Sequence, residues 1–158
     1  MRDNLWLEQK LEQIWNQYFG EVPKLNEIKI KFGFKAKRRL ASIRQKDIKN
    51  KCSDTQILVT GFFQDERVPE YVVDVTLAHE ICHYVHGFAS PLPKFSRYPH
   101  RGSLVDTELR ERGLGKLLAE QNIWLKSTWH EIVGRDYHKR KLRRRKVQRS
   151  IFDLFSIF

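Results

Sequence analysis

The sequence predicts an α+β fold in which a small sheet of about three strands packs on one central helix, with flanking helices around them. Three observations predict it. Apolar residues recur at helical spacing near the N-terminus, three short stretches between residues 28 and 63 have strand-like patterns, and residues 69–86 form a long apolar helical run. The chain has 158 residues, 41% of them hydrophobic, which is enough for the core of one domain.

The first helix and the strands come from periodicity. A helix ended by Gly20 is predicted from Leu5, Trp6, Leu7, Leu11, Ile14, Trp15, Tyr18 and Phe19. Ile28, Ile30, Phe32 and Phe34 then alternate with Lys and Gly, a pattern typical of a half-buried strand. A second short strand is expected around residues 40–44. Residues 55–63 are the strongest strand candidate, and we expect this strand to be exposed at the sheet edge.

The second half is predicted to be helical around a loop. The central helix should run over about residues 69–86, with Pro69 in its first turn and Gly87 at its end. Residues 88–102 are rich in proline and should form a loop across a cleft. Ser103 is expected to cap a helix that carries Glu108, and a further helix should bury its tryptophans. We assign residues 1–133 to one domain and residues 134–158 to a basic tail.

The central helix contains the pattern H-E-x-x-H, formed by His79, Glu80, Ile81, Cys82 and His83. Four helical residues advance by about 400° and roughly 6 Å, so His79 and His83 point the same way from consecutive turns. Two neutral imidazoles so placed can share a zinc ion, which needs a third protein ligand and leaves a fourth position for water. Glu80 lies beside that water as its general base.

The third ligand has two candidates. His100 follows the motif by seventeen residues, in the loop before the next helix, and Glu108 offers a carboxylate from that helix. His86 lies on the same helical face, but it is about 7.5 Å along the axis from the midpoint of His79 and His83, which is too far. We therefore favour His100 over Glu108, and expect His86 to interact with the helix dipole or to shape the cleft.

The motif, the loop and the segment His100-Arg101-Gly102 resemble the SprT-like zinc metallopeptidases, which include the Spartan proteases. The resemblance covers roughly residues 25–125 and implies a zincin-like core. It also implies that His79, His83 and His100 bind Zn2+ and that Glu80 is catalytic. Two departures are Arg101, which separates His100 from glycine, and the lack of a following cysteine zinc ribbon. Small gluzincins, in which a glutamate such as Glu108 is the third ligand, are the alternative resemblance.

Charge and cysteine usage suggest partners and compartment. The net charge of +11 falls to +3 without residues 139–149, which hold eight Lys or Arg and no acid. This segment could bind DNA or RNA through phosphates, although basic runs are often only solvated surface. The charged N-terminus and the absence of about 18 consecutive apolar residues lead us to expect a cytoplasmic protein. Cys52 and Cys82 are expected to be free thiols.

These features lead us to expect a zinc metalloendopeptidase that hydrolyses peptide bonds in protein substrates, including proteins associated with nucleic acid. Besides the gluzincin alternative, the chain could be a nucleic-acid-binding module in which zinc only stabilises the fold. A structural zinc site normally has four protein ligands, often cysteines, and no cysteine spacing here offers them.

Overall fold

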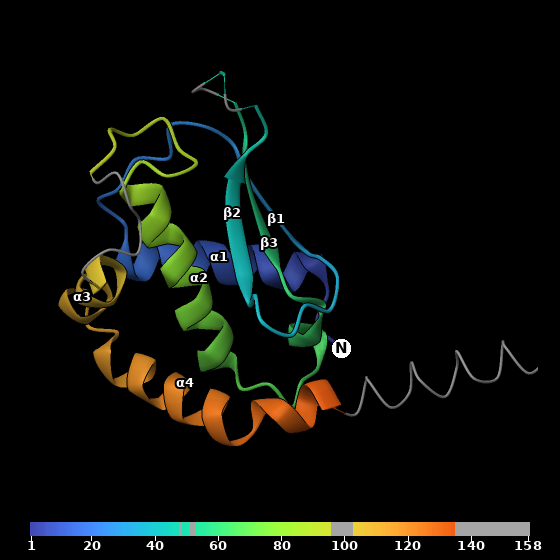
Figure 1. The fold of residues 1–158 in the computed structure, drawn as a ribbon. Helices are drawn as coiled ribbons and strands as arrows, with labels where there is room; N and C mark the ends of the chain where they lie inside the picture. Colours follow the sequence, from blue (N-terminus) through green and yellow to red (C-terminus); the bar gives the residue numbers. More distant parts are fainter. Residues whose placement is uncertain (48, 51–52, 96–102, 135–158) are drawn as a thin grey trace, which may run out of the picture. The chain divides into compact units, whose positions relative to one another are not determined.

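The computed structural model describes residues 1–47, 49–50, 53–95 and 103–134. It confirms the α+β class, with helices around one three-stranded sheet (Figure 1). The elements in chain order are α1 Asn4–Tyr18, β1 Ile28–Phe32, β2 Ala41–Gln45, β3 Thr55–Val59, η1 Gly61–Gln64, α2 Glu70–Val85, α3 Leu104–Glu111 and α4 Gly115–Ser127. By its internal contacts the chain divides into two compact units, Met1–Ile123 and Trp124–Phe158.

The strands lie in the order β1-β3-β2. β3 runs parallel to β1, with Ile28 opposite Thr55, and antiparallel to β2, with Ala41 opposite Val59. The prediction that the strand at residues 55–63 is an exposed edge is therefore wrong, because β3 is the central strand and both of its backbone edges are paired. The edges belong to β1 and β2.

β3 is also shorter than predicted. It ends at Val59, and the chain enters the short 3-10 helix η1, where the Thr60 side chain accepts a hydrogen bond from the backbone N–H of Phe62. Gly61 permits this turn, because a Cβ on it would lie 2.7 Å from the carbonyl oxygen of Gly33. The β-branched and aromatic residues that suggested a long strand thus belong to two elements.

The core lies between one face of the sheet and the helices α1 and α2. The Asp3 side chain begins α1 by accepting a hydrogen bond from the backbone N–H of Trp6 at 2.8 Å. Each of these elements directs apolar side chains to the same interior, namely Leu7, Leu11, Ile14, Trp15, Ile30, Ile57, Val59, Val72, Val73, Leu77 and Ile81. Burial on the sheet and on α1 therefore fixes the face that α2 turns towards the cleft.

The expected central helix is α2, which begins after Pro69 and ends before Gly87. Gly87 has a φ of 73°, and a Cβ there would lie 2.4 Å from the Pro93 carbonyl oxygen, so only glycine fits this helix end. The Tyr84 hydroxyl donates to the Asn26 side chain at 2.9 Å and accepts from the backbone N–H of Leu25 at 3.0 Å. These contacts fasten α2 to the segment that leads into β1.

The helices after the loop differ in detail from the sequence expectation. Ser103 does precede α3, but its backbone is left-handed with φ 58° and its side chain makes no capping hydrogen bond. Gly113, with φ 84°, separates α3 from α4. In the second unit, Trp124 and Trp129 are half-buried and their rings lie 6.0 Å apart. Within the described residues, no helix is long and apolar enough to span a bilayer.

Candidate metal centre

α2 carries the motif residues. The neighbouring residues Leu77, Ala78, Ile81 and Cys82 are fully buried, and this orientation turns the motif side chains towards the cleft. The Nε2 atoms of His79 and His83 lie 3.2 Å apart, and their rings meet edge to face at a centroid distance of 4.8 Å. The predicted juxtaposition of these two imidazoles one helical turn apart is present in the structure.

This spacing fits a shared zinc ion. Two nitrogens that bind one tetrahedral zinc at about 2.0–2.1 Å must lie about 3.3 Å from each other. The observed separation of 3.2 Å between the Nε2 atoms matches that requirement. His79 and His83 could therefore hold zinc with little movement of either side chain.

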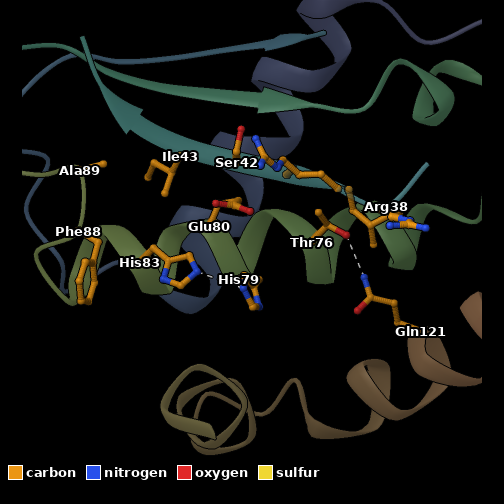
Figure 2. A pocket seen from close by; sticks show the side chains of 13 residues that line it. Arg38, Ser42, Ile43, Thr76, His79, Glu80, His83, Phe88, Ala89 and Gln121 are labelled. Carbon is orange, nitrogen blue, oxygen red and sulfur yellow. Dashed lines mark hydrogen bonds between the residues drawn. The ribbon is translucent and has the colours of Figure 1, made fainter. Parts of the chain in front are cut away.

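The imidazoles and Glu80 line an open cleft of about 650 Å3 between α2 and β2. Figure 2 shows the Glu80 side chain directed towards β2, with the His79 and His83 rings beside each other along α2. The remaining lining comes from the segment before β2, from β2, from α2 itself, from the chain just after α2 and from α4, namely Arg38, Arg39, Leu40, Ala41, Ser42, Ile43, Thr76, Phe88, Ala89 and Gln121.

Glu80 is a buried carboxyl group, with only 6% of its surface exposed. Burial raises the pKa of Glu80 to about 7, whereas the backbone N–H of Ile43 and the positive charge of Arg39 act in the opposite direction. A carboxyl group that titrates close to neutrality can both accept and return a proton. The role of Glu80 as a general base stays a prediction.

The structure describes only one of the two candidates for the third zinc ligand. His100 lies outside the described residues. Glu108 is described, and its carboxylate contacts His86 Nε2 and accepts a hydrogen bond from Arg112 Nε at 2.9 Å. Within the part of the chain that the structure describes, no group of three or more His, Cys, Asp or Glu could hold a metal ion. The structure therefore does not bring Glu108 to the histidine pair.

His86 has its own environment at the end of α2. Its ring is buried, stacks on Phe95 at a centroid distance of 5.6 Å and contacts the Glu108 carboxylate. The sequence analysis expected a dipole or cleft-shaping role, and did not foresee this link between α2 and α3. No sequence signal pairs these two residues, which are 22 positions apart.

Cys82 lies within the motif but points away from the cleft. It is a free, fully buried thiol, as predicted, and burial raises the pKa of this thiol. A thiol that stays protonated is a poor zinc ligand, because zinc binds the thiolate. Cys52, the other predicted free thiol, lies outside the described residues.

Sequence reasoning missed several residues of the cleft. Arg38 and Arg39 belong to a basic run before β2 that was visible in the sequence, whereas Ser42 and Ile43 reach the cleft only because β2 borders α2. Gln121 is buried, and its side-chain amide donates to the Val72 carbonyl oxygen and the Thr76 hydroxyl, each at 2.9 Å. These two bonds hold α4 against α2 at the far end of the cleft.

Comparison with known proteins gives no match for this chain among family models, curated proteins or solved structures.

Proposed function

We propose that the protein is a zinc-dependent metalloendopeptidase with a zincin-like core. One observation carries the proposal: two imidazole nitrogens 3.2 Å apart line the same open cleft as a buried carboxyl group. This combination supplies a metal-holding pair, a proton acceptor and room for a polypeptide in one place. The resemblance to SprT-like metallopeptidases gives the same assignment to the same residues.

Each residue then has a chemical role. His79 and His83 hold the zinc, with His100 as the proposed third ligand. Bound zinc supplies Lewis acidity, which polarises the peptide carbonyl and lowers the pKa of water. Glu80 accepts the proton of the attacking water and returns it to the leaving amine nitrogen. Glu80 is buried beside β2 and lines the same cleft as the two imidazoles, which supports this role.

β2 provides a place for the peptide substrate. Leu40 and Lys46 hydrogen-bond to the β3 side through Thr60 and Asp54, so the backbone groups of the odd-numbered residues Ala41 and Ile43 point away from β3. These groups border the cleft that contains Glu80. An extended peptide that adds a strand at this edge can pair with Ala41 and with the Ile43 carbonyl group, but it would have to take the Ile43 N–H from the Glu80 carboxyl group. We therefore assign the pairing with substrate to β2, in place of the edge strand expected at residues 55–63.

The surroundings of Glu108 favour the SprT-like assignment over the gluzincin alternative. Its carboxylate is engaged by His86 and Arg112, and using it as a zinc ligand would require both contacts to break. A module with a purely structural zinc would need four protein ligands. The described residues contribute two, both on the wall of an open cleft.

The test separates metal binding from hydrolysis. The purified chain should bind about one zinc, and Glu80→Gln should keep the metal while losing casein or peptide cleavage by about 100- to 10,000-fold, because Gln cannot accept the proton. Glu120→Gln, which changes a partly exposed carboxylate on α4, is the matched control. Undiminished cleavage by Glu80→Gln would refute the mechanism.

We further propose that the basic tail binds DNA or RNA and so directs the enzyme to proteins associated with nucleic acid. Residues 139–149 lie outside the described part of the chain, and the proposal rests on their eight positive charges. Deleting residues 139–158 should weaken binding of a labelled oligonucleotide at low salt and leave peptide cleavage largely intact. Equal binding by both proteins across a salt series would remove this partner assignment.

A further inference from the structure

The outer face of the sheet, opposite the core, is polar and accessible. Strand register places Lys29, Gln56 and Arg44 in one row across this face, and Lys31, Leu58 and Ser42 in the next. In both rows the β1 residue is exposed and the β3 residue is half-buried. Alternation along the strands thus directs apolar side chains to the core and basic ones outwards.

Positive charge is concentrated here as well as in the tail. Residues 28–50 contain nine Lys or Arg and a single acid, Asp47. The net charge outside the tail is small because two regions of opposite charge offset each other. Residues 28–50 are strongly basic, and the remainder of residues 1–138 is slightly acidic. The sequence analysis, which placed the basic field in the tail alone, was incomplete.

Several cations of this segment form no ion pair with a described carboxylate, unlike cations elsewhere in the structure. Lys10, Lys24 and Arg112 form ion pairs with carboxylates of neighbouring elements. Among the described residues, Lys31 and Arg39 make no ion pair. Arg44 donates only to the neutral amide oxygen of Gln56, at 2.7 and 3.1 Å. The charges of Lys31 and Arg44 are available to an anion because no described ion pair neutralises them, whereas the charge of Arg39 also acts on the buried Glu80 carboxyl group.

The outer face is hollowed into a groove of about 640 Å3, with cations and an aromatic ring on its walls. We name it the outer groove and define it by Lys31, Phe34, Arg39, Arg44 and Leu58. Phe34 is 96% exposed, although its backbone is fixed by a hydrogen bond from the Gly61 N–H to its carbonyl oxygen at 3.2 Å. A large apolar ring held in water beside unpaired cations indicates a ligand with both flat and anionic parts.

We propose that the outer groove binds single-stranded nucleic acid. Lys31, Arg39 and Arg44 would contact phosphates, and Phe34 would stack on an unpaired base. An acidic peptide would satisfy the cations but gives Phe34 no flat partner, and a duplex keeps its bases inside the stack. Arg39 also lines the cleft beside α2, so a bound strand lies close to the candidate metal centre. The inference goes beyond the proposed peptidase activity and does not depend on it.

The test uses the full-length chain and fluorescein-labelled oligonucleotides of about 15 residues, oligo-dT and oligo-U, over about 50–300 mM salt. Fluorescence anisotropy compares Lys31→Ala/Arg44→Ala and Phe34→Ala with the control Lys116→Ala/Lys126→Ala, which removes two exposed lysines from α4. Because every variant keeps the basic tail, differences between them report on the sheet. Circular dichroism confirms that each variant is folded.

The double charge variant should bind about tenfold or more weakly, and its slope of log affinity against log salt should be shallower by about 1.4, since each single-strand phosphate contact contributes about 0.7. Phe34→Ala should weaken binding by about fivefold or more with an unchanged slope. A preference for oligo-dT assigns the groove to DNA and a preference for oligo-U assigns it to RNA, and either supports the proposal.

Three results would overturn the proposal. In the first, Lys31→Ala/Arg44→Ala binds like the control. In the second, polyglutamate competes as well as the oligonucleotide and Phe34→Ala has no effect, which makes the outer groove a surface for acidic polypeptides. In the third, Lys31→Ala/Arg44→Ala weakens the binding of a duplex of the same length more than it weakens the binding of the single strands.

Discussion

His79 and His83 share α2 with His86, but the two groups of imidazoles have different partners. His86 is buried between Phe95 and the Glu108 carboxylate, which Arg112 also binds. His79 and His83 face each other across 3.2 Å on the wall of an open cleft. A histidine with a carboxylate partner joins two helices, whereas two imidazoles that converge beside a cleft can bind a metal. The role of each histidine on α2 is therefore decided by the side chains around it more than by its residue type or its helical face.

The largest expected effect comes from removing one histidine of each kind, which tests whether His83 and His86 differ in zinc binding. His83→Ala should lower zinc affinity by orders of magnitude, because it removes one of the two convergent nitrogens. His86→Ala should leave zinc stoichiometry unchanged, because His86 is engaged by Glu108. Metal analysis after dialysis against a weak chelator measures both variants. Loss of zinc from His86→Ala alone would reverse the assignment of the two groups.

A second pair of variants tests which residue is the third zinc ligand. His100→Ala should also lower zinc affinity by orders of magnitude, whereas Glu108→Ala should lower it much less, because the Glu108 carboxylate lies with His86 and Arg112. Competition with a fluorescent zinc chelator gives both affinities under the same conditions. The opposite order would place the protein with the gluzincins.

The smallest expected effect concerns stability. Glu108→Ala should lower the free energy of unfolding by about 1–3 kcal/mol, because it leaves the half-buried Arg112 and the buried His86 without their shared acceptor. Urea denaturation measures the change, and Glu111→Ala, at an exposed position of α3, is the matched control. Equal stability of the two variants would mean that the contact does not stabilise the fold.

The sequence predicted the features that depend on local periodicity. The convergence of His79 and His83 follows from the helical repeat, and the bounds of α2 follow from Pro69 and Gly87. Alternation predicted β1, and β-branched and aromatic residues predicted β3. It could not predict that β3 is central, because strand order is decided by contacts between distant segments. The Glu108–His86 contact and the outer groove were missed for the same reason. The third ligand stays a prediction, because His100 lies outside the described residues.

The order β1-β3-β2 also has a consequence for how the chain folds during synthesis. Both outer strands precede the strand to which they bind, so neither can form its ladder of backbone hydrogen bonds before Thr55–Val59 has been made. A growing chain that ends before Thr55 holds two unpaired strands, with the apolar side chains of Ile30 and Ile43 uncovered. Because chains are made from the N-terminus at about 5–20 residues per second, this exposed interval lasts on the order of seconds. Completion of β3 joins both strands in one step.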